Sequence, residues 1–103
     1  MRKVKFMLNS RQRAQLRSMA NSLQSIFQIG KGGVGEQLIH QVNEALEARE
    51  LIKLTVLETS PIKARECADT IATATESDVV QVIGSKFILY KESKENKQIK
   101  LVK

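Results

Sequence analysis

The chain of 103 residues carries 17 basic and 11 acidic residues, for a net charge of +6, and 42% of its residues are hydrophobic. This length suits one domain with a modest core, and no apolar run approaches the roughly 18 residues that a membrane span needs. The single cysteine, Cys67, excludes an internal disulfide and a cysteine-rich metal site, and we expect a cytoplasmic protein.

The first part of the chain predicts a helix, a strand and a second helix. Asn9 can cap the first helix, and Gln12 completes a capping box. Apolar residues follow at helical spacing, at Leu16, Met19, Ala20 and Leu23. Residues 25–29 are β-branched and aromatic and predict a strand. An amphipathic pattern then predicts a helix over about residues 36–49.

The second part predicts a strand, a helix and a hairpin. Apolar and polar residues alternate over 51–57, as in a half-buried strand. Ser60-Pro61 predicts a helix start with proline at the first position, and Gly84 predicts a tight turn between strands 79–83 and 87–90. The order α-β-α-β-α-β-β favours an α/β (α+β) domain with a four-stranded mixed sheet. Residues 92–103 are lysine-rich and predict a mobile tail, with extra strand pairing over 98–102 as the alternative.

Charge is distributed unevenly along the chain. Residues 1–35 hold seven basic residues and no acid, residues 36–90 have a net charge of −4, and residues 91–103 have a net charge of +3. Such polarity is expected of a protein that meets a polyanion on one side, although an irregular surface charge is the plainer alternative.

A glycine-rich segment, Gly30-Lys31-Gly32-Gly33, joins the first predicted strand to the second helix. Glycines allow a ligand to approach the backbone, and a helix start attracts anions. The segment therefore predicts a phosphate-binding loop. A nucleotide-binding P-loop would continue with Lys and then Ser or Thr, but Glu36 and Gln37 stand there, so ATP hydrolysis is not expected.

The remaining candidates for chemistry indicate a binding protein rather than an enzyme. His40 is expected on the surface, and Cys67 is expected as a small buried hydrophobe. The acids Glu66, Asp69, Glu76 and Asp78 look like a solvated face rather than a metal site. Phe27 and Phe87 are expected in the core, which leaves no platform for stacking bases. We expect no catalytic residue, no metal and no cofactor.

Several collinear stretches resemble the YhbY-like, or CRM (chloroplast RNA splicing and ribosome maturation), domain family. They are Leu8-Asn9-Ser10-Arg11-Gln12-Arg13 with Leu16-Arg17, Gln28-Ile29-Gly30-Lys31-Gly32-Gly33, Glu50-Leu51-Ile52-Lys53-Leu54, Val79-Val80-Gln81-Val82-Ile83-Gly84 and Leu89-Tyr90-Lys91. The resemblance implies an RNA-binding domain over 8–91, after an N-terminal extension, with a fold similar to the C-terminal domain of translation initiation factor three. It also implies a G-x-x-G loop at Gly30 to Gly33. Stand-alone bacterial members associate with precursors of the large ribosomal subunit.

The chain departs from this family's pattern in three places. Asn9 stands where Thr is frequent, and Gly35 stands where a Ser or Thr helix cap is usual. After Gly84 the usual Arg is absent, and Lys86 is the nearest base. Residues 1–7 precede the usual start, and Met7 is an alternative initiator.

Two functions follow from the sequence. The first is an RNA-binding factor for assembly of the large ribosomal subunit, acting as a monomer on ribosomal RNA and not on a membrane. Its predicted RNA-binding residues are Gly30, Lys31, Gly32, Gly33, Arg13, Arg17, Arg11 and Lys53. The alternative is a protein-interaction domain that docks a basic partner on acidic helices. Those helices carry Glu44, Glu47, Glu66 and Asp69.

Overall fold

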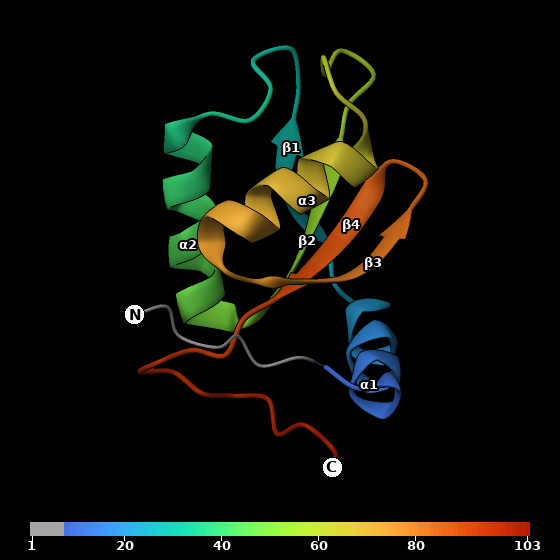
Figure 1. Ribbon diagram of the computed structural model, residues 1–103, viewed down its shortest axis with the longest axis vertical. Helices are drawn as coiled ribbons and strands as arrows, with labels where there is room; N and C mark the ends of the chain where they lie inside the picture. Colours follow the sequence, from blue (N-terminus) through green and yellow to red (C-terminus); the bar gives the residue numbers. More distant parts are fainter. Residues whose placement is uncertain (1–7) are drawn as a thin grey trace.

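The computed structural model describes residues 8–103, so the predicted extension at residues 1–7, with its three basic residues, lies outside the described part. Figure 1 shows the arrangement of the helices and strands. They are α1 (Ser10–Ala20), β1 (Ser25–Ile29), α2 (Glu36–Arg49), β2 (Leu51–Val56), α3 (Ala64–Thr75), β3 (Asp78–Ile83) and β4 (Lys86–Tyr90). No helix in this part of the chain is long and apolar enough to span a membrane.

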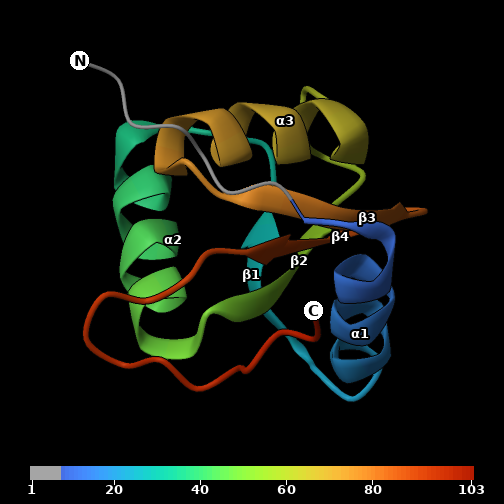
Figure 2. The same cartoon turned by 60° about the horizontal axis from the view of Figure 1, so that its bottom comes forward.

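The four strands form one mixed sheet in the order β1-β2-β4-β3. β1 and β2 run parallel, while β4 is antiparallel to both of its neighbours, β2 and β3. Helix α3 lies on one side of the sheet and α1 on the other, as Figure 2 shows. The predicted α+β fold with a four-stranded mixed sheet is confirmed.

The larger core lies between the sheet and helices α2 and α3. The predicted alternation of β2 is confirmed, because Ile52, Leu54 and Val56 all point into this core. Phe87 is fully buried there and Phe27 packs against it, as expected. Burial of these side chains against two helices is the main source of stability on this face.

The smaller core lies on the opposite face of the sheet, under α1. Leu16 and Ala20 of the helix pack there against Leu51, Ile88 and Tyr90. Burial of the tyrosine raises its pKa to about 12, so the ring stays neutral at physiological pH. α1 begins with the predicted capping box, in which the Asn9 side chain accepts from the Gln12 amide.

The start of the third helix was predicted three residues too early. Ser60 and Pro61 lie in the loop before α3, which begins only at Ala64. The Ser60 hydroxyl donates to the Ile62 carbonyl at 2.7 Å and accepts from the Ile62 amide at 3.3 Å. Serine side chains that bond to the backbone two residues on favour turns over helices, which explains the difference.

Residues 92–103 lie against the domain, which differs from the mobile tail that their composition predicts. The Glu50 carboxylate, which is fully buried, accepts the backbone amides of Ser93, Gln98 and Ile99 at 2.7–2.8 Å. The Glu47 carboxylate accepts hydrogen bonds from the Ser93 hydroxyl and from the backbone amides of Lys94 and Glu95, at 2.8–2.9 Å. The alternative of a fifth strand over 98–102 is also wrong, because the backbone of this segment bonds to the side chains of Glu50, directly after α2, and of Gln12 and Gln15 on α1 instead of to a strand.

Candidate nucleic-acid interface

The predicted phosphate-binding segment forms a tight turn between β1 and α2. The Gly33 amide donates to the Gly30 carbonyl at 2.9 Å, which closes the turn with Lys31 and Gly32 at its tip. Lys31 and Gly32 are both exposed. A Cβ added at Gly32 would meet nothing within 4 Å, so the backbone of this residue is open to a ligand.

Gly33 has a different role from its neighbour. Its φ of +66° lies in the left-handed region that favours glycine. A Cβ at this position would come within 3.2 Å of the Pro61 side chain in the loop between β2 and α3. Gly33 is therefore required by the fold of the turn, and Gly32 is the glycine that leaves space for a ligand.

The turn leads into the N-terminus of α2, which no side chain caps. Gly35 is the N-cap residue and has no side chain that could accept an amide of the first turn. The first turn therefore keeps free N–H groups next to the Lys31 turn, and these groups and the helix dipole attract anions, while the exposed Glu36 carboxylate in the same turn opposes that attraction. Gly35, at the position where the family usually has Ser or Thr, thus leaves the backbone amides of the first helical turn available as donors.

The predicted arginines lie on α1, at a distance from the glycine turn. α1 packs near one end of the sheet, whereas the turn follows the opposite end, as Figure 1 shows. The Arg13 guanidinium donates to the Val79 carbonyl of β3 at 2.7 Å, so this side chain also has a structural role. Arg17 lies one helical turn further on the same side and is half-exposed, and Arg11 is exposed.

Lys53 lies on β2, an interior strand, and not at an edge of the sheet. Its neighbours Ile52 and Leu54 point to the larger core, so Lys53 points to the α1 side. Of the predicted residues, the structure thus brings the four of the turn together and groups the arginines on α1. Lys53 lies on the sheet between these two groups.

The other two titratable candidates, His40 and Cys67, differ in exposure. His40 is exposed, with its Nε2 3.6 Å from a Glu44 carboxylate oxygen one helical turn away. Cys67 is fully buried, as predicted, and burial raises the pKa of its thiol. Within residues 8–103, no three His, Cys, Asp or Glu side chains come together as metal ligands.

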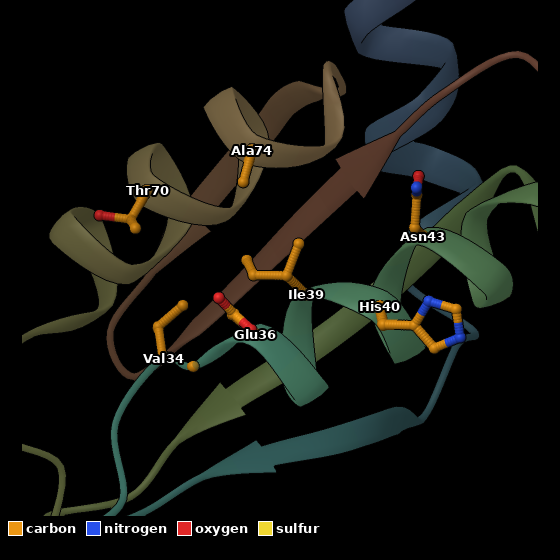
Figure 3. Close-up of a pocket in the computed structure, with 8 residues that line it drawn as sticks. Val34, Glu36, Ile39, His40, Asn43, Thr70 and Ala74 are labelled. Carbon is orange, nitrogen blue, oxygen red and sulfur yellow. The ribbon is translucent and has the colours of Figure 1, made fainter.

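A groove of about 590 Å³ runs between α2 and α3 from the start of α2. Figure 3 shows Val34 and Ile39 on one side of it and Thr70 and Ala74 on the other. Glu36 also lines the groove, and its carboxylate repels phosphate. The groove is therefore a poor path for a nucleic-acid backbone.

Sequence reasoning missed the role of Glu47, on α2, and of Glu50, directly after α2, in holding residues 92–103. Nothing in the local pattern marks them, because their partners lie more than forty residues away. It also missed Pro61 as the support of the turn at Gly33. A glycine at a left-handed position beside a rigid loop residue leaves no signature in a single sequence.

Comparison with known proteins identifies a family and several relatives. The model of the CRS1 / YhbY (CRM) domain matches residues 8–91. The probable RNA-binding protein YqeI of Bacillus subtilis is 50% identical over 95 residues, which cover 92% of this chain and 99% of YqeI. An RNA-binding protein of Haemophilus influenzae is 29% identical over 90 residues, which cover 87% and 91%. The solution structure of SAV1595 from Staphylococcus aureus matches 93% of this chain and all of that chain, with 50% identity and a TM-score of 0.77.

Proposed function

This chain belongs to the CRS1/YhbY (CRM) domain family, and from that premise we propose that it binds RNA through the glycine turn and its basic surroundings. It acts without catalysis, on ribosomal RNA of a large-subunit precursor. Relatives at 50% and 29% identity are named RNA-binding proteins, which supports the choice of RNA among polyanions.

One observation carries the proposal. The tip of the turn is open main chain at Gly32, beside the Lys31 ammonium and the uncapped start of α2. A phosphate placed there would meet backbone amides and a cation at once. Small residues in such a loop let a sugar-phosphate backbone approach closely, as in other domains with a G-x-x-G loop.

The arginines of α1 contribute a second, weaker contact region. Arg11 and Arg17 form no hydrogen bond or ion pair among the described residues, so their guanidinium groups are free for phosphate. Arg13 uses one nitrogen on the Val79 carbonyl and keeps further donors. Contacts of this kind bind backbone and do not read sequence.

A pair of variants at Gly32 tests the loop directly. Gly32→Glu adds bulk and a negative charge where a phosphate would lie, and Gly32→Gln adds the same bulk without the charge. We expect the glutamate variant to bind a structured ribosomal RNA fragment much more weakly than the glutamine variant. Equal affinities, with unchanged far-UV circular dichroism, would exclude this turn as the phosphate site.

The assembly role has a separate test. A tagged copy of the protein in cell extract at low magnesium should sediment with precursors of the large subunit on a sucrose gradient. Lys31→Ala should move it toward the top of the gradient. Sedimentation of the wild type as free protein alone would contradict the assembly role without touching RNA binding.

The alternative of an acidic docking surface loses one of its main residues. The Glu47 carboxylate is occupied by Ser93, Lys94 and Glu95, and these contacts lower its pKa. A basic partner would have to displace three donors there. Retention of a protein partner after complete RNA digestion would favour this alternative.

A further inference from the structure

Helix α1 covers only part of the face of the sheet on which it packs. Four side chains form a row across it, one from each strand, at the end of the sheet next to the glycine turn. They are Gln28, Thr55, Lys86 and Ile83. None of them belongs to either core, and all but the half-buried Thr55 are exposed.

The register of the strands places this row. Gln28 pairs with Thr55, Thr55 with Lys86, and Lys86 with Ile83. Alternation puts all four on the α1 side, since Ile88, two residues after Lys86, packs under α1. At the usual strand spacing the row spans roughly 14 Å.

The row is continuous with the proposed RNA site. Gln28 lies on β1, two residues before Gly30, so the glycine turn begins next to this end of the row. In the middle of the row, the Val56 amide donates to the Ser85 carbonyl at 2.6 Å, which ties the β3–β4 hairpin to the end of β2. This contact fixes Lys86 beside Thr55.

Charge and chemistry in this area suit a polyanion. Lys86 lies in the row and Lys53 lies beside it, and neither forms a hydrogen bond or ion pair among the described residues. The row contains no acidic residue, and Asp78, on the same face, lies at the other end of β3, opposite Tyr90. Ile83 is 57% exposed and Ile26, also on this face, is 36% exposed. These two side chains offer apolar contact to unstacked bases.

We propose that single-stranded RNA leaves the glycine turn across this row, with its backbone on Lys86 and Lys53 and its bases against Ile83 and Ile26. The inference rests on the proposed function and extends it from one loop to a strip of the sheet. It also connects the turn to the arginines of α1, because Arg13 reaches β3 from the covered part of the same face. The opposite direction, along the groove between α2 and α3, would bring phosphates to Glu36.

The test measures affinity for a fluorescent single-stranded uridine homopolymer by anisotropy at several salt concentrations. Lys86→Gln removes one cation from the row, and its matched control, Lys94→Gln, removes one from an exposed site near α2. We expect Lys86→Gln to lose about fivefold in roughly 0.1 M salt, with a salt slope lower by about 0.7, as for one lost phosphate contact. The control should stay within about twofold of the wild type.

A second pair of variants tests the apolar part of the row. Ile83→Asp places a negative charge in the path, and Ile83→Asn has nearly the same size. We expect Ile83→Asp to bind the homopolymer at least about fivefold more weakly than Ile83→Asn. Because the side chain is mostly exposed, both variants should keep the wild-type circular dichroism spectrum.

The outcomes separate this inference from the proposed function. If Gly32→Glu loses binding while Lys86→Gln and Ile83→Asp match their controls, RNA takes another path and the inference is wrong. If Gly32→Glu also binds like Gly32→Gln, the loop proposal falls and this inference falls with it. If the wild type sediments as a dimer that Ile83→Asp dissociates, the row is an interface between copies of the chain, which also overturns the inference.

Discussion

The Glu50 carboxylate accepts the backbone amide of Ser93, 43 residues further along the chain, at 2.8 Å. Glu50 itself has a φ of +66°, an uncommon conformation for glutamate. Burial acts to raise the pKa of this carboxyl, but the amides of Ser93, Gln98 and Ile99 outweigh burial and hold the pKa below its ordinary value of 4.5. This buried carboxylate thus holds the C-terminal segment together with Glu47 and the side chains of α1.

Glu50→Gln should lower stability and weaken its dependence on pH. A carboxyl with a lowered pKa in the folded state contributes stability above pH 4.5, and this contribution is lost as the pH falls through the folded pKa. We expect the variant to lose about 3 kcal/mol at neutral pH, since a neutral amide replaces a charged acceptor of three donors. Urea unfolding followed by circular dichroism at neutral pH and below pH 4.5 measures both effects.

Glu66→Gln is the matched control for that measurement, because Glu66 is exposed on α3. It should change stability by less than about 0.5 kcal/mol. If the two variants showed the same stability across the acid range, the buried carboxylate would not hold the segment.

Gly33→Ala should destabilise the protein, and Gly32→Ala should not. The first change places a Cβ at a φ of +66° and within 3.2 Å of Pro61, which costs about 1–2 kcal/mol. The second has open space around the new methyl group. Thermal unfolding of both variants decides the matter, and equal midpoints would contradict the assignment of distinct roles to the two glycines.

Arg13→Gln and Arg17→Gln should differ in stability. Only Arg13 donates to a backbone carbonyl, that of Val79 in β3, so its loss should cost about 1 kcal/mol. The loss of Arg17 should cost less than about 0.5 kcal/mol. Both variants should weaken RNA binding, and the salt dependence of affinity separates that effect from folding.

Cys67 should react slowly with a thiol reagent in the folded protein and fast in urea. The side chain is fully buried and burial raises the pKa of its thiol, which lowers the fraction of thiolate. Reaction requires opening of α3 or of its neighbours. A native rate equal to that of the unfolded chain would show that α3 does not cover this cysteine.

Regular periodicity allowed most of the fold to be predicted. The second helix was predicted at the residues where α2 lies, and the alternation of β2 identified its buried face. The predictions that were wrong depended on contacts that periodicity does not contain. Ser60 lies in a turn instead of a helix start, and Glu47 of α2 and Glu50 directly after it hold residues 92–103 against the domain.

The glycine turn of the candidate site could be predicted from the sequence, but the position of the turn relative to the other candidate residues could not. Glycines and a lysine between a strand and a helix identified the turn, because that chemistry is local. The separation of the turn from the arginines, and the open row between them, depends on how far α1 extends over the sheet. Roles of single residues in RNA binding stay predictions until the variants are measured.

The contact between Gln12 and Val102 joins the beginning of α1 to a residue 90 positions later. During synthesis, α1 emerges from the ribosome long before residues 99–102, which complete its surroundings. The smaller core therefore closes only after translation has passed Val102, and such long-range closure slows folding. Until then, the nascent chain exposes the apolar side of α1, and a chaperone that binds apolar helices can bind this surface.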